Sequence, residues 1–168
     1  MDQGEQARIF NDWISNHQGL LFKIVRAYAF NVHDREDLLQ EISIQIWNSI
    51  PSFKGDSSVT TWLYRIGLYS AIAWSKRERK HRESATQLDQ AVYVIRATEE
   101  PPDPRLDWLY DQIAKLDEVD RSLALMWLDG TSYQDMADAT GMTPSNVGVK
   151  ISRMKKYFVS LQPMATIQ

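Results

Sequence analysis

The chain has 168 residues, 43% of them hydrophobic and 24% charged, which is the balance of an ordinary globular protein and allows one domain or two small ones. It contains no cysteine, so disulfides, thiolate chemistry and cysteine-ligated zinc are excluded. The formal net charge of −3 argues against tight binding of nucleic acid by the chain on its own.

The charges are unevenly distributed along the chain. Residues 76–82 hold five Lys or Arg against one acid, and residues 140–168 hold four against none. The stretch 99–120 is acidic and holds eight Asp or Glu, which offset the positive charge of the two basic stretches. Such blocks predict two basic contact surfaces on an otherwise acidic protein, although solvated helix faces would give the same pattern.

Apolar residues recur at helical spacing along most of the chain, and no segment shows the alternation of a strand, which predicts an all-α fold. Asp34 is expected to cap the second helix, Pro51 to end it, and Thr60 or Thr61 to begin the third. No apolar stretch reaches the roughly 20 residues that would cross a membrane, and no secretory signal is present, so we expect a cytoplasmic protein without membrane insertion. The predicted helices occupy 20–29, 38–50, the segment from 60 to the basic block, 106–116, 119–127 and two segments within 132–157.

Residues 84–105 are predicted to be a linker between two small helical domains, 1–83 and 106–168. The linker is polar, and three prolines between 101 and 104 forbid a continuous helix there. Residues 90–97 are more apolar than a free linker should be and could pack on a partner.

The segment 132–157 has the pattern of a helix-turn-helix. Ala137, Gly141 and Val147 have the required spacing, because the alanine lets two helices approach, the glycine supplies a left-handed residue and the valine packs the second helix onto the first. An ordinary helical hairpin would share this triad, so the triad alone is only moderately specific.

The ends of the two helices strengthen the DNA-binding interpretation. Ser132 and Asp135 form a capping box, and Thr143 with Pro144 is a strong helix start. Short polar residues near a helix N-terminus can reach base edges, and basic residues further along can bind phosphates. The outward side chains of the second helix are Ser145, Asn146, Lys150 and Arg153.

A second signal lies in the first half, where acidic and amide side chains share one side of the second predicted helix. No Lys or Arg follows within helical-neighbour range, so these carboxylates are not neutralised within the helix. The face could be plainly solvated, or it could dock a basic partner. Its members are Asp37, Gln40, Glu41, Gln45 and Asn48.

Three segments resemble the bacterial sigma factors of RNA polymerase. Residues 34–41 (DREDLLQE) resemble the polymerase-binding motif of conserved region 2, and 53–66 (FKGDSSVTTWLYRI) resemble its promoter-melting loop and following helix. Residues 116–157 resemble region 4 with its helix-turn-helix. A chain with only these two regions is similar to the extracytoplasmic-function (ECF) group, which implies a region 2 bundle of three or four helices and a small region 4 domain.

The resemblance implies a docking role for the first motif and a strand-reading role for the second. The first would bind the clamp helices of the largest polymerase subunit, through Asp34, Asp37, Leu38, Gln40 and Glu41. The loop would capture a base flipped from the melted element near minus ten, and the helix after it would hold the strand and the adjoining duplex. These residues are Phe53, Lys54, Gly55, Asp56, Ser57, Thr61, Trp62, Arg65, Tyr69, Lys76, Arg77, Arg79 and Lys80.

The resemblance also implies that the second helix of the helix-turn-helix reads the element near minus thirty-five. The expected partners are core RNA polymerase, through its clamp helices and flap region, promoter DNA and an anti-sigma factor. No cofactor and no metal are implied. The expected contacts near minus thirty-five are Thr143, Ser145, Asn146, Lys150, Arg153, Lys155 and Lys156.

The third predicted helix departs from the family pattern. Tyr69 stands where an Asn is common, Ala73 where an Asp or Asn is frequent, and Gly67 where Ala is usual. Tyr69 could be a core residue, or it could stack on a base and alter promoter preference.

The sequence bears differently on three other classes of protein. An enzyme is not expected, because no phosphate-binding glycine loop is present and the three His lack metal-ligand spacing. The alternatives that remain are a helix-turn-helix regulator that does not dock on polymerase and an interaction module such as an adaptor.

Overall fold

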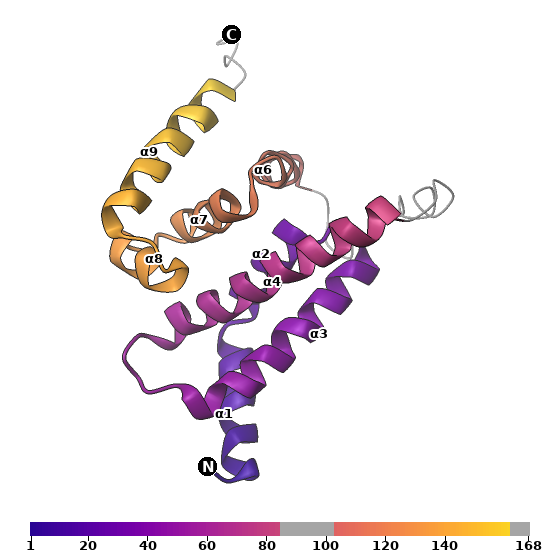
Figure 1. Ribbon diagram of the computed structural model, residues 1–168, viewed down its shortest axis with the longest axis vertical. Coiled ribbons are helices and arrows are strands. Elements are labelled where there is room, and N and C mark those ends of the chain that lie inside the picture. The colour runs from indigo at the N-terminus through magenta and orange to yellow at the C-terminus, as the bar shows by residue number, and fades with distance from the viewer. Residues whose placement is uncertain (85–102, 162–168) are drawn as a thin grey trace.

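The computed structural model describes residues 1–84 and 103–161, and all regular structure within them is helical, which confirms the all-α prediction (Figure 1). In Figure 1, α3 and α4 run side by side, and the start of α1 and the end of α9 lie at opposite ends of the molecule. The elements are α1 (Gln3–Asn16), α2 (Gln18–Tyr28), α3 (Val32–Ser49), the 3-10 turn η1 (Ile50–Ser52), α4 (Val59–Ser84), α6 (Pro104–Ala114), α7 (Glu118–Leu128), α8 (Tyr133–Thr140) and α9 (Pro144–Leu161).

The first half is a bundle in which α2, α3 and α4 pack against one another. Gly67 lies where α4 crosses α2, and a Cβ there would come within 2.8 Å of the Ile24 Cδ1 atom. The glycine therefore permits a close approach of two helices, which offsets its low helix propensity. The core of this half is built from Leu21, Ile24, Val25, Leu38, Ile42, Ile46, Leu63 and Leu68, all buried.

The expected cap of α3 is wrong by one turn. Asn31 is the N-cap, and its side-chain oxygen accepts a hydrogen bond from the Asp34 N–H at 2.8 Å. Asp34 lies inside the first helical turn, where a carboxylate favours the positive end of the helix dipole without capping it. The Asn side chain can accept from the third residue after it, and this local bond sets the start of the helix.

Helix α1 was not predicted from the sequence. Asp2 caps it by accepting a hydrogen bond from the Gly4 N–H. Its buried Trp13 and the partly buried Ile9, Phe10 and Ile14 pack on the core at helical spacing. That spacing, directly after an acidic cap, was the available signal.

The second half contains α6 to α9, and its expected caps are confirmed. Ser132 accepts from the Asp135 N–H at 3.1 Å, and Thr143 accepts from the Asn146 N–H at 3.2 Å. Gly141 adopts φ +74° and ends α8 in the left-handed conformation that the helix-turn-helix pattern predicted.

The two halves are in direct contact. Helices α6 and α7 pack on α2, and α7 and α8 pack on α4. The apolar segment 90–97, expected to meet a partner, lies outside the described residues. Among the described residues, none of the helices has the length and apolar character needed to span a membrane.

Candidate nucleic-acid and polymerase interfaces

The acidic face of α3 borders a shallow groove between α3 and α4. Asp37 and Gln40 are exposed, and Glu41 is partly exposed. A cavity of about 700 Å³ runs beside them, and Arg77 of α4 reaches across it to place Nη2 3.5 Å from the Glu41 carboxylate. The groove therefore offers carboxylates with an apolar rim that includes Ile44, which is half-exposed.

Two other residues expected in the docking motif are buried. Leu38 has no exposed surface and belongs to the core. Asp34 is 5% exposed, accepts from Arg82 Nη2 at 2.7 Å and is also bonded to Asn31 Nδ2 at 2.7 Å. Both residues therefore orient α3 from inside, whereas the exposed members of the motif face solvent.

The loop that follows η1 begins with an aromatic cluster. Phe53 lies edge-on to Trp13 with ring centroids 5.1 Å apart, and its ring is tilted against Trp62 at 5.4 Å. The Trp62 indole N–H donates to the Ser49 hydroxyl at 3.1 Å. These contacts anchor the start of the loop and of α4.

The tip of the loop carries the more accessible expected contacts. Lys54, Gly55 and Asp56 are exposed, and Gly55 has φ +78°. Thr61 is buried, and its backbone N–H donates to the Ser58 hydroxyl at 3.1 Å, so it secures the start of α4. The arrangement presents a short polar tip on a rigid aromatic base.

Tyr69 is neither a core residue nor a free side chain. It is 49% exposed, and its hydroxyl donates to the Thr140 carbonyl oxygen at 3.2 Å. Thr140 is the last residue of α8, so this contact joins α4 to the helix-turn-helix. Arg65 and Ala73 on the same helix are exposed.

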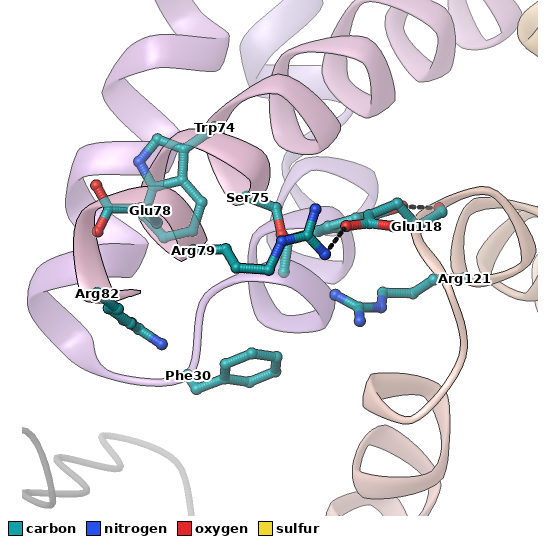
Figure 2. Close-up of a pocket in the computed structure, with 9 residues that line it drawn as sticks. Phe30, Trp74, Ser75, Glu78, Arg79, Arg82, Glu118 and Arg121 are labelled. Atoms are coloured by element: carbon teal, nitrogen blue, oxygen red, sulfur yellow. Dashed lines mark hydrogen bonds and ion pairs between the residues drawn. The ribbon is translucent and has the colours of Figure 1, made fainter. Parts of the chain in front are cut away.

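Three arginines of the basic segment pair with acids of this chain. Arg77 contacts Glu41 and Arg82 contacts Asp34, both within the first half. Arg79 contacts Glu118 of α7 at 2.9 Å, and Figure 2 shows this pair beside Arg121 at the edge of a cavity of about 340 Å³. Lys76 and Lys80 of the same segment are exposed.

Helix α9 presents an exposed polar face, as expected. Val147, Ile151 and Met154 are buried beneath it. Lys150 is paired with Asp120 of α7 at 2.9 Å, and Lys155 Nζ lies 5.6 Å from the centroid of the Trp127 ring. The exposed residues of this expected contact set are Thr143, Ser145, Asn146, Arg153, Lys155 and Lys156.

Sequence reasoning missed the polar contacts between the halves. Asp129 directly follows α7, and its carboxylate accepts from Lys23 of α2 and from the Tyr64 hydroxyl of α4. Burial raises the pKa of the Tyr64 hydroxyl above its ordinary range, and the bond to Asp129 raises it further. An Asp directly before a Gly indicates only the end of a helix, so the local sequence does not predict the contacts of Asp129 with Lys23 and Tyr64.

The fold defines an all-α helix-turn-helix protein, and comparisons with known proteins narrow the class. Residues 13–81 match the family model described as Sigma-70 region 2. The chain is 30% identical over 154 residues to the ECF RNA polymerase sigma factor SigX of Bacillus subtilis. This match covers 82% of this chain and 77% of that relative. It is 27% identical over 177 residues to the ECF RNA polymerase sigma-E factor of Haemophilus influenzae, covering 98% and 93%.

The solved structures agree on the fold. The sigma factor RpoE from Bartonella quintana, in complex with the anti-sigma factor NepR, superposes with a TM-score of 0.68 at 19% identity and covers 93% of this chain and 99% of that chain. The chain belongs to the extracytoplasmic-function RNA polymerase sigma factors.

Proposed function

We propose that this chain binds core RNA polymerase through the exposed face of α3 and directs it to promoter DNA. The observation that carries the proposal is the exposed Asp37 and Gln40 beside the partly exposed Glu41 on one face, in a chain that also holds a helix-turn-helix. The clamp helices of the largest subunit would receive this face, and the flap region would receive the second half.

The promoter contacts are divided between the halves. The loop tip at Lys54, Gly55 and Asp56, with Arg65 on α4, would take the melted strand near minus ten. The exposed face of α9 would read the element near minus thirty-five, and its basic residues would bind phosphates without regard to sequence. The protein would act in the cytoplasm, where polymerase and promoter are.

An anti-sigma factor is a proposed further partner. The RpoE relative of known structure was solved in complex with such a protein. The acidic groove beside α3 could serve polymerase and an inhibitor in turn, because a partner that covers Asp37 and Glu41 would block docking on core.

Reversal of the docking charges tests the proposal. Asp37→Lys combined with Glu41→Lys should abolish co-elution with purified core polymerase and the specific transcripts, because like charges would meet at the interface. The matched control is Glu5→Lys with Asp12→Lys, two exposed acids of α1 with the same change in net charge.

Two outcomes separate the alternatives. If the wild-type chain does not bind core polymerase, the proposal fails, and specific binding to duplex DNA would then indicate a regulator that does not dock. If neither core binding nor any effect of Lys150 and Arg153 on DNA is found, an adaptor is indicated.

A further inference from the structure

Val149 is an apolar side chain in the middle of the outward face of α9. It is 47% exposed, whereas Val147, Ile151 and Met154 on the opposite side of the helix are buried. At 3.6 residues per turn, Val149 points almost directly away from that buried stripe. Valine is a weaker helix former than alanine, and an exposed side chain adds little packing, so the folding of α9 does not explain this residue.

The neighbours of Val149 on this face change in character along the helix. Ser145 and Asn146, about one turn before it, are exposed and short, and Arg153, one turn after it, is exposed and basic. Side chains three or four positions apart are neighbours on a helix, with about 5–6 Å between their Cβ atoms. The face therefore has an apolar centre, short polar side chains toward its N-terminal end and a long cation toward its C-terminal end.

Two basic side chains of α9 turn toward α7 and away from this centre. Lys150 pairs with Asp120 at 2.9 Å, and Lys155 Nζ lies 5.6 Å from the centroid of the Trp127 ring. The middle of the outward face is thus left to short side chains. The backbone of α9 can therefore come close to a surface that this face binds.

DNA offers an apolar counterpart to Val149. In the major groove, which admits an α-helix, thymine is the base that presents a methyl group. Contact of an aliphatic side chain with that methyl group removes apolar surface of both from water. A side chain as short as valine makes this contact only where the helix lies close to the bases, which the short Ser145 and Asn146 side chains permit.

We infer that Val149 reads the methyl group of a thymine in the minus-thirty-five element. The inference rests on the proposed function, because it requires α9 to enter the major groove of promoter DNA. Ser145 and Asn146 then contact base edges beside the thymine, and Arg153 binds a phosphate. Val149 is absent from the contacts that the sequence predicted near minus thirty-five, since that set holds polar and basic side chains alone.

Replacement of thymine by uracil tests the inference, because the two bases differ only by the 5-methyl group. Holoenzyme reconstituted from core polymerase and the full-length chain is bound to a promoter fragment in which thymines are replaced at random. Cleavage of the bound and unbound fractions at uracil locates each thymine whose methyl group matters. At one thymine of the minus-thirty-five element, uracil should weaken binding by about fourfold, the effect of one methyl group withdrawn from water.

Val149→Ala links the effect to this side chain. Holoenzyme with the variant should bind the thymine promoter about three- to tenfold more weakly, and should no longer distinguish thymine from uracil at that position. Alanine is the better helix former, so the weaker binding cannot come from loss of α9. Val159→Ala, the same change at a more exposed valine in the last turn of α9, is the matched control and should keep full discrimination.

The outcomes separate the inference from the proposed function. The absence of a uracil effect in the minus-thirty-five element, or an equal effect with wild type and Val149→Ala, overturns the inference while specific transcription by the holoenzyme stands. Weaker binding of Val149→Ala to core polymerase, with full discrimination of thymine, would indicate a protein contact and also overturns it. If the holoenzyme directs no specific transcript, the proposed function fails and the inference falls with it.

Discussion

Tyr69 is a half-exposed aromatic residue of α4 that also contacts the second half of the chain. Its hydroxyl donates to the Thr140 carbonyl oxygen at the end of α8, where the helix itself provides no partner. A half-exposed aromatic ring has a face available for stacking on an unpaired base.

Substitution of Tyr69 separates a stacking role of the ring from the hydrogen bond of its hydroxyl to Thr140. Tyr69→Ala should reduce open-complex formation about 5- to 150-fold, because base–aromatic stacking contributes ~1–3 kcal/mol. Tyr69→Phe keeps the ring and loses only the bond to Thr140, so it should melt promoters as well as the wild type. Permanganate footprinting of the holoenzyme measures melting, and gel filtration with core polymerase verifies unchanged docking. Equal melting by Tyr69→Ala and wild type would discard the stacking role.

Gly67 has a low helix propensity, but its lack of a side chain permits the close packing of α4 on α2. Gly67→Leu should lower the free energy of unfolding by about 1–3 kcal/mol, because the Cβ alone would lie 2.8 Å from Ile24 Cδ1. Gly19→Ala on α2, where no atom lies within 4 Å, should instead stabilise by up to ~1 kcal/mol. Urea denaturation compares the two, and equal effects would show that packing at the α2–α4 crossing is unimportant.

At the scale of elements, the turn between α8 and α9 depends on a left-handed residue. Gly141→Ala should destabilise the second half by about 1–2 kcal/mol, because φ +74° is costly for a residue with a Cβ. Space is not the obstacle, since the Cβ would lie 3.5 Å from the Tyr69 hydroxyl, an ordinary contact. Gly148→Ala within α9 is the control and should be neutral or stabilising. Thermal unfolding followed by circular dichroism would contradict this if the two variants matched.

Helix α9 carries two kinds of basic residue. Arg153 is exposed, whereas Lys150 is held by Asp120 of α7. Arg153→Ala should weaken binding to a minus-thirty-five duplex and reduce the salt slope by about 0.9, the value for one phosphate contact. Asp120→Asn frees Lys150 and should strengthen binding. Titrations at several salt concentrations measure both, and an unchanged slope for Arg153→Ala would remove it from the phosphate contacts.

At the scale of the whole molecule, three tyrosines connect the halves. Burial raises the pKa of Tyr28, Tyr64 and Tyr110 above the ordinary value of about 10, and the Asp129 carboxylate adds to the effect at Tyr64. Tyr28 and Tyr64 donate to the second half, and the Tyr110 ring lies 4.3 Å from the Arg26 guanidinium. The neutral phenols are therefore part of the interface between the two halves.

These pKa shifts predict alkaline destabilisation. The folded-state pKa values lie above the unfolded value, so the stabilisation is complete below pH ~10 and is lost as pH rises beyond it. The free energy of unfolding should fall between pH 9 and pH 11, while absorbance at alkaline pH reports tyrosinate formation. Tyr64→Phe should show a smaller fall, and an equal free energy of unfolding at both pH values would contradict the assignment.

The sequence by itself determined the helical class, the helix-turn-helix and its caps. These features depend on local properties of the chain, such as the hydrogen bond between Ser132 and Asp135 or the left-handed conformation of Gly141. The order of residues along the chain is therefore enough to predict them. Helix α1 carried such a pattern too, in its Asp2 cap and its apolar spacing. The acidic side of α3 was likewise visible as a periodicity.

Only the tertiary structure decided which of the expected contacts are available. Asp34 and Leu38 share a motif with Asp37, yet they are buried, because the packing of α3 on its neighbours and not its spacing decides which face is covered. The interface between the two halves joins Lys23 to Asp129 across 106 positions and Tyr64 to Asp129 across 65. Contacts at such separations depend on how whole helices dock, and no periodicity along the chain records that.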